Sequence, residues 1–173
     1  MRKLDHRLLL ALRTRGHSPN LDSIMQGLGA VGEHGRIWAG IGLFGFVFSL
    51  RRQRQWLVAA GIGPAAIGLN YGIKRLVGRP RPSIEGLPPL GSAPSSLSFP
   101  SAHATSSVAA AIALSQLAPE ARPYLFALAA AICVSRPYLG MHYPSDVVAG
   151  MALGAALGTA VTKINPDQEH LYP

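Results

Sequence analysis

The sequence predicts an all-α, polytopic membrane protein: a helix bundle with five to six transmembrane helices and N-terminal interfacial helices. Charged residues make up only 14% of the 173 residues and hydrophobic residues 49%, whereas soluble domains carry about 25% charged residues. The mean hydropathy is positive, at +0.24. Five apolar stretches follow one another with almost no polar face to present to water. The chain has the length of one domain, which we expect to be an integral-membrane domain over residues 1–173.

Residues 1–35 are expected to form one or two helices that lie at the membrane interface or re-enter it. In Asn20–Leu28 the apolar residues recur at helical spacing on one side, and Ser18 is placed to cap this helix. The apolar run Leu8–Leu12 is too short for the core of a signal peptide. If this region crosses the bilayer, it supplies the sixth span.

The transmembrane core is expected over residues 36–163, followed by a cytoplasmic tail over residues 164–173. The longest uncharged run, Gln55–Ile73, has 19 residues and as a helix is about 28 Å long, close to the thickness of a bilayer core. The other runs are shorter and need flanking residues or a thinner bilayer to cross it. They are Ile37–Leu50, Ser101–Leu117, Pro123–Ser135 and Val147–Thr162.

The basic loop Arg51–Arg54 sets the expected orientation, because such loops face the cytoplasm. Alternating spans then place residues 79–102 and Arg136–Asp146 on the extracytoplasmic side and the C-terminus in the cytoplasm. We therefore expect a multi-pass plasma-membrane protein whose active site faces outward. Four basic residues within Lys74–Arg81 go against this rule on the outer side and need another explanation.

Charge and cysteine content exclude other classes of protein. The net charge is +8, but the basic residues lie in clusters between apolar runs and no nucleic-acid-binding module accompanies them. A nucleic-acid partner is therefore not expected. Cys133 is the single cysteine, which excludes an internal disulfide and a multi-cysteine metal site.

The last predicted span carries a stripe of glycines. Gly150, Gly154 and Gly158 recur every four residues and so lie on one helix face. Such a face lets a neighbouring backbone approach closely. We expect internal packing here in preference to a dimer seam, although a homo-oligomer stays open.

Three polar motifs interrupt the apolar pattern. They are KRLVGRPRP at Lys74–Pro82, FPSAH at Phe99–His103 and SRPYLGMHYPSD at Ser135–Asp146. The predicted topology places all three at one membrane surface, and ionisable clusters at membrane depth are rare outside functional sites. The motifs are therefore expected to converge on a single site.

The cations of these motifs predict a phosphate pocket. Lys74, Arg81 and Arg136 offer three positive charges, which suit a phosphoryl dianion. Ser101, with the amides of Ala102 and His103, is expected at a helix N-terminus, where free N–H groups and the helix dipole bind anions. Arg79 is either a further phosphate contact or a charge on the rim, and we favour the rim.

The remaining polar residues predict acid–base and nucleophilic chemistry. Pro144 is placed to begin a helix with Asp146 in its first turn, within reach of His142. A carboxylate on one imidazole nitrogen fixes the tautomer and aims the other nitrogen, as a nucleophilic histidine requires. His103 remains as the acid for a departing alkoxide.

The arrangement Lys-x6-Arg-Pro, Pro-Ser-x-His and Ser-Arg-x5-His-x3-Asp resembles the type 2 phosphatidic acid phosphatase superfamily over roughly Asn70–Thr162. The resemblance implies a core of six transmembrane helices and no metal or other cofactor. It also implies that His142 forms a phosphohistidine oriented by Asp146, and that His103 protonates the leaving group. The phosphate ligands it implies are Lys74, Arg81 and Arg136. Ala102 replaces the usual glycine of the second motif, which is harmless wherever φ is negative.

The resemblance implies a metal-independent phosphatase that cleaves a phosphomonoester or pyrophosphate from a lipid in the bilayer. The short, arginine-rich form is similar to actinobacterial phosphatases of polyprenyl-linked lipids, so the expected substrate is the 5-phosphate of decaprenylphosphoryl-5-phosphoribose, used in cell-wall arabinan synthesis. Undecaprenyl or decaprenyl pyrophosphate and phosphatidylglycerophosphate are the rival substrates. A polyprenyl-phosphate carrier that binds without turnover is the alternative from another class.

Overall fold

The computed structural model describes residues 2–93 and 95–164, and within them it is all-helical apart from one isolated bridge between Pro80 and Leu97. This confirms the all-α class. The α-helices are α1 (Arg2–Thr14), α2 (Pro19–Gly32), α3 (Arg36–Phe48), α4 (Gln53–Val77), α5 (Ala102–Leu117), α6 (Arg122–Tyr138) and α7 (Pro144–Ile164). Two short 3-10 helices, η1 (Glu33–Gly35) and η2 (Pro119–Ala121), connect α2 to α3 and α5 to α6. Of the predicted tail, residues 165–173 lie outside the described residues.

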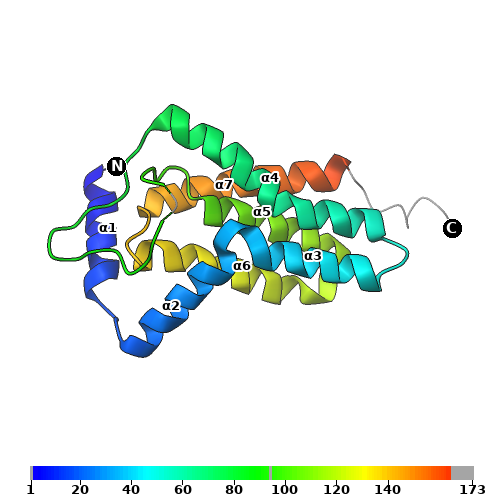
Figure 1. Ribbon diagram of the computed structural model, residues 1–173, viewed down its shortest axis with the longest axis horizontal. Helices are drawn as coiled ribbons and strands as arrows, with labels where there is room; N and C mark the ends of the chain where they lie inside the picture. Colours follow the sequence, from blue (N-terminus) through cyan, green and yellow to red (C-terminus); the bar gives the residue numbers. More distant parts are fainter. Residues whose placement is uncertain (1, 94, 165–173) are drawn as a thin grey trace.

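Helices α3 to α7 lie alongside one another, and α1 and α2 lie across one end of this bundle (Figure 1). Helix α5 is central, because it contacts α4, α6 and α7. Most of its residues are buried and small, so that three neighbours can pack around it at short distance. Larger side chains from the surrounding helices complete the core, including Trp38, Leu125 and Ile132.

The glycine stripe of α7 faces α5. A Cβ atom added at Gly150 would lie 2.6 Å from the Ser101 carbonyl oxygen, and one added at Gly154 would lie 2.5 Å from that of Thr105. Both distances are far inside van der Waals contact. The prediction that this stripe serves internal packing is confirmed.

The outer surface of the bundle is rich in large apolar side chains. On α3, Phe44 and Phe48 are 66% and 71% exposed, and on α7 Val148 is 65% exposed. Soluble monomers rarely expose apolar patches of this extent. The surface therefore matches a hydrocarbon environment.

Within the described part of the chain, two helices, α4 and α7, are long and apolar enough to cross a membrane by length and composition. Helices α3, α5 and α6 have 13, 16 and 17 residues and are therefore about 20–26 Å long. A bilayer core is about 30 Å thick. The figure of five to six crossings stays a prediction.

The N-terminal region forms two helices that belong to the folded body. Leu9 of α1 is fully buried, and the buried Arg13 donates hydrogen bonds to the carbonyl oxygens of Tyr138 and Pro88. At the start of α2, the Ser18 hydroxyl accepts a hydrogen bond from the Leu21 N–H at 3.2 Å, which confirms the predicted cap. Both helices cover the end of the bundle where α4 ends and α7 begins (Figure 1).

The contact between α5 and α7 gives a stability test. We expect Gly154→Ala to lower the free energy of unfolding by about 1–3 kcal/mol, because the new methyl group must push the two backbones apart. Gly68→Ala is the matched control, because a Cβ there meets nothing within 4 Å. Thermal unfolding of both variants in detergent measures the difference. Equal stability of the two variants would show that the helices are not packed this closely.

Candidate active site

Four helix ends bring the three sequence motifs together. Lys74 lies in the last turn of α4, His103 in the first turn of α5, Arg136 in the last turn of α6 and Asp146 in the first turn of α7. A cavity of about 280 Å³ opens between them. The predicted site residues that line it are Lys74, Arg81, Ala102, His103, Arg136 and His142.

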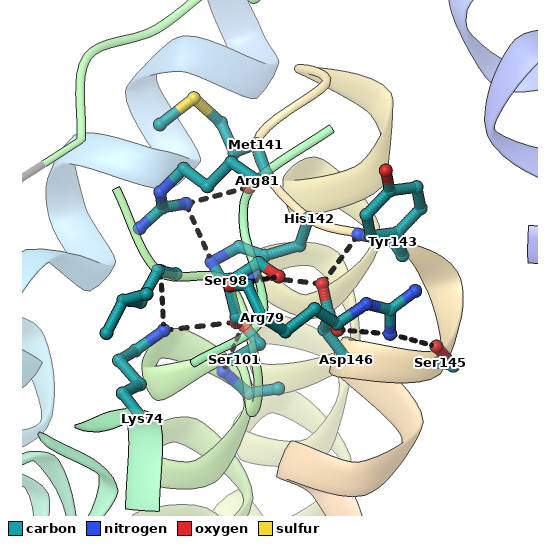
Figure 2. A network of polar contacts seen from close by, with 12 residues as sticks. Lys74, Arg79, Arg81, Ser98, Ser101, Met141, His142, Tyr143, Ser145 and Asp146 are labelled. Carbon is teal, nitrogen blue, oxygen red and sulfur yellow. Dashed lines mark hydrogen bonds and ion pairs between the residues drawn. The ribbon is translucent and has the colours of Figure 1, made fainter. Parts of the chain in front are cut away.

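Two of the cations are held in place by backbone carbonyl groups (Figure 2). The Lys74 ammonium donates hydrogen bonds to the Leu97 and Ser98 carbonyl oxygens at 3.1 and 3.0 Å. The Arg81 guanidinium donates to the carbonyl oxygens of Ser95 and Met141, each at 2.7 Å. Carbonyl groups orient these side chains but carry no net charge, so the positive charge remains available to an anion.

Arg136 is the third cation and depends on α2 for its space. Its side chain is 4% exposed, and its Nε atom has no hydrogen-bond partner. A Cβ added at Gly29 of α2 would lie 2.5 Å from the Arg136 Nη1 atom. The absence of a side chain at position 29 therefore creates the room that the guanidinium occupies.

Ser101 and Ala102 share the start of α5 but differ in their surroundings. The Ser101 hydroxyl accepts a hydrogen bond from the Ala104 N–H, and its own N–H donates to the Asp146 carbonyl oxygen at 2.9 Å. Ser101 is fully buried and joins α5 to α7. Ala102 lines the cavity, and among the described non-glycine residues only His34 has a positive φ. An alanine therefore fits this position without backbone strain.

His142 lies in the turn before α7, and its surroundings define its tautomer. The Arg81 Nη1 group, which can only donate, lies 3.2 Å from the His142 Nε2 atom. Nε2 therefore accepts, and the hydrogen of the neutral ring is on Nδ1. Burial lowers the pKa of His142 to about 4, and the positive charges of Arg81 and Lys74 also lower it. Asp146 has the opposite effect and raises this pKa. The imidazole is thus neutral at physiological pH.

Asp146 lies close to His142 but is held by other groups. Its Oδ2 atom is 3.7 Å from the His142 Nδ1 atom, beyond hydrogen-bond distance. The same oxygen accepts a hydrogen bond from the Tyr143 N–H at 2.9 Å, and Oδ1 accepts one from Arg79 at 2.7 Å. The orienting role of Asp146 stays a prediction.

Arg79 is not the rim charge that the sequence favoured. Its Nη1 atom donates a hydrogen bond to Asp146 at 2.7 Å (Figure 2). Its Nη2 atom donates to Asp5 of α1 at 2.9 Å. The guanidinium also lies over the Tyr143 ring, 4.2 Å from its centroid. Arg79 is not one of the described residues that line the cavity. Buried carboxylates attract this side chain away from the phosphate pocket.

His103 is placed by residues that sequence reasoning did not select. Its Nε2 atom donates to the Gly29 carbonyl oxygen at 3.1 Å and lies 3.5 Å from the Glu33 carboxylate. Asn70, deeper in the cavity, donates to the Thr105 hydroxyl at 3.0 Å. Asn70 could have been found as an isolated amide in an apolar span. Gly29 and Glu33 carry no such signal, because only the fold brings η1 and α2 to this site.

A membrane-embedded bundle whose helix ends gather three cations and two histidines around one cavity is the architecture of an integral-membrane phosphatase. The chain belongs to the PAP2 superfamily, whose family model matches residues 54–169.

Relatives and solved structures agree with this assignment. The chain is 40% identical over 146 residues to the decaprenylphosphoryl-5-phosphoribose phosphatase of Mycobacterium tuberculosis, which covers 84% of this chain and 81% of the relative. A PAP2-type phosphatidylglycerolphosphate phosphatase from Bacillus subtilis superposes with a TM-score of 0.78 at 25% identity, over 95% of this chain and 85% of that one. LpxE from Aquifex aeolicus gives a TM-score of 0.76 at 26% identity, over 92% and 95% of the two chains.

The dependence of Arg136 on Gly29 predicts a change in activity without a loss of fold. We expect Gly29→Ala to lower kcat/KM for phosphate release about tenfold, because the new methyl group displaces one charged hydrogen-bond donor of the pocket. Gly27→Ala is the control on the same helix, since a Cβ there meets nothing within 4 Å. Steady-state phosphate release and a thermal unfolding curve measure both effects. Wild-type kcat/KM in Gly29→Ala would contradict the prediction.

Proposed function

We propose that this chain removes a phosphate from a polyprenyl-linked lipid through a phosphohistidine on His142. The observation that carries the proposal is a neutral, buried imidazole whose Nε2 lone pair faces the cation-lined cavity. A neutral imidazole is the nucleophilic form of histidine. The surrounding cations suit the charge that develops on a transferring phosphoryl group.

In the first proposed step, a phosphate enters the cavity and takes over the contact between Arg81 and His142. The Nε2 atom attacks phosphorus, a P–N bond forms, and the bond to the leaving oxygen breaks. Lys74, Arg81 and Arg136 stabilise the charge on the three equatorial oxygens. His103 gives a proton to the leaving oxygen, and its Nε2 atom lies 3.5 Å from the Glu33 carboxylate.

In the second step, a water attacks the phosphohistidine. The now neutral His103 accepts a proton from this water, the P–N bond breaks, and inorganic phosphate leaves. His142 returns to the neutral form with its hydrogen on Nδ1. Among the described residues, no group of three or more His, Cys, Asp and Glu side chains could hold a metal ion, and the proposed steps use none.

The proposed substrate is decaprenylphosphoryl-5-phosphoribose carrying a 5-phosphate. The name of the 40% identical mycobacterial relative supports it, and so does a second cavity of about 630 Å³ that shares Glu33, Ala93 and Arg136 with the first. The second cavity has the polar side chains of Gln26, Arg36 and Ser92 in its wall. A ribosyl group beside the reacting phosphate could therefore make hydrogen bonds there.

The first cavity also has a route for the lipid tail. Ile67 and Tyr71 of α4 line it, and the Tyr71 side chain is 51% exposed on the outer surface of the bundle. A prenyl chain that leaves along this side stays in contact with the bilayer. Phosphatidylglycerophosphate is the second candidate, because the Bacillus subtilis phosphatase with this name shares the fold at a TM-score of 0.78.

A substrate panel tests this proposal. Purified protein should release phosphate fastest from decaprenylphosphoryl-5-phosphoribose, compared with decaprenyl pyrophosphate and phosphatidylglycerophosphate, and EDTA should not reduce the rate. His142→Ala should lower the rate by about 10³-fold or more, because it removes the nucleophile. With a ³²P-labelled substrate, acid-labile label should be trapped on the wild type and be absent from His142→Ala.

Three outcomes would overturn parts of the proposal. Undiminished phosphate release by His142→Ala would exclude the phosphohistidine. Preference for another lipid in the panel would replace the substrate. Tight binding of the polyprenyl lipid without any release would make the chain a carrier.

We also propose that the cavity faces the extracytoplasmic side. The support is the basic segment Arg51–Arg54, which includes part of the turn between α3 and α4 and the first residues of α4. It lies at the opposite end of the bundle from the last turn of α4 and the first turn of α7 (Figure 1).

Labelling of a single cysteine tests the orientation. Ser92→Cys lies in the exposed loop beside the second cavity, so it should react with a membrane-impermeant maleimide in intact cells. The native Cys133 is buried and serves as the internal blank. Labelling that requires broken cells would reverse the orientation.

A further inference from the structure

A buried ion cluster lies on the side of Asp146 that faces away from the cavity. Arg79 is at its centre and bridges two carboxylates, Asp146 of α7 at 2.7 Å and Asp5 of α1 at 2.9 Å. Asp146 is fully buried, Asp5 is 6% exposed, and the Arg79 side chain is 24% exposed. Because these charges are largely removed from water, they act on one another more strongly than a surface pair would.

Asp5 also fixes the start of α7. Its Oδ1 atom accepts a hydrogen bond from the Ser145 N–H at 2.9 Å, and its Oδ2 atom accepts one from the Ser145 hydroxyl. Arg79 donates a further hydrogen bond to this hydroxyl at 2.8 Å (Figure 2). N–H groups in the first turn of a helix have no partner within the helix. A carboxylate from α1 therefore supplies the partner for α7, three residues after His142.

The cluster leaves Asp146 with both oxygens engaged. Arg79 takes Oδ1 and the Tyr143 N–H takes Oδ2, so the carboxylate remains 3.7 Å from the His142 ring. We infer that Arg79 and Asp5 are positioning residues for the reaction: Asp5 holds Arg79 against Asp146, and Arg79 limits the negative charge that Asp146 presents to His142. This inference rests on the proposed role of His142 as the nucleophile.

The physical reason is a balance of charge. An unpaired Asp146 would favour the imidazolium form of His142, which has no lone pair for attack. The positive charge of Arg79 partly neutralises the Asp146 carboxylate, and the Asp5 carboxylate in turn partly neutralises Arg79. The other charged or titratable side chains that line the cavity with His142 come from four helices and a loop: Glu33 and His34 of η1, Tyr71 and Lys74 of α4, Arg81 of the loop after it, His103 of α5 and Arg136 of α6. The substitutions at Arg79 and Asp5 leave the identity of all these side chains unchanged.

The test is a direct titration of His142 in the full-length protein. Histidine labelled with ¹³C at Cε1 gives an NMR signal whose shift follows protonation, and His142→Gln assigns it among the six histidines. Wild-type His142 should titrate near pH 4. In Arg79→Gln the midpoint should rise by about one pH unit, because a positive charge behind Asp146 is lost. In Asp5→Asn it should fall, because Arg79 is no longer offset.

Matched variants separate this role from a purely structural one. Arg79→Lys keeps the charge and should keep the midpoint, while kcat falls because the two-sided hydrogen bonding is lost. Arg75→Gln removes an exposed arginine from the same segment and should change neither the midpoint nor the activity. Loss of packing alone would not move the midpoint in opposite directions in Arg79→Gln and Asp5→Asn. Equal midpoints in all four variants would overturn the inference.

Kinetics then separates the inference from the proposed function. Arg79→Gln should lower kcat about tenfold with little change in KM, because Asp146 and the turn that carries His142 lose the hydrogen bonds that position them. If His142→Ala retains full activity, the proposed function fails even where the titration shifts are seen. If His142→Ala is inactive and Arg79→Gln has wild-type kcat, the proposed function stands and the positioning role is wrong.

Discussion

The structure depends on three cations, two of them buried and one half-buried, that share their cavity with a single carboxylate, Glu33, among the described residues. Burying a charge costs free energy unless polar groups replace its water, and Lys74 and Arg81 meet this requirement through carbonyl oxygens of the loop between α4 and α5 and of the turn before α7. Burial lowers the pKa of Arg81, and the Asp146 and Glu33 carboxylates oppose that effect. The loop carbonyl groups therefore orient Lys74 and Arg81, and these two side chains hold the loop in place. A bound phosphate would neutralise the remaining positive charge.

Close packing of the central helix makes this arrangement possible. Because α5 has small residues and α7 presents glycines to it, Ser101 of α5 lies within hydrogen-bond distance of the Asp146 carbonyl group. That contact places the first turns of both helices, and hence His103 and His142, around one cavity. The close packing of α5 against α7 therefore also sets the positions of the two histidines at the cavity.

The sequence was sufficient for the features that depend on local spacing. Helix class, the Ser18 cap, the glycine stripe and the meeting of the three motifs could all be predicted from periodicity and from residue types at helix ends. The partners of Arg79 could not, because Asp5 lies 74 positions away on a helix with no motif. Gly29 and Glu33 were missed for the same reason: their importance comes from where α2 and η1 lie.

These missed residues share a location, and this has a functional consequence. The family match begins at residue 54, after Asp5, Gly29 and Glu33. The matched part supplies the proposed phosphate ligands and both histidines, whereas the preceding helices supply the space for Arg136, the partner of His103 and the counter-charge of Arg79. They also form part of the second cavity. The N-terminal helices therefore complete the surroundings of the proposed phosphoryl-transfer centre, and a change in these helices can alter its pH response or its choice of head group without any change in the motifs.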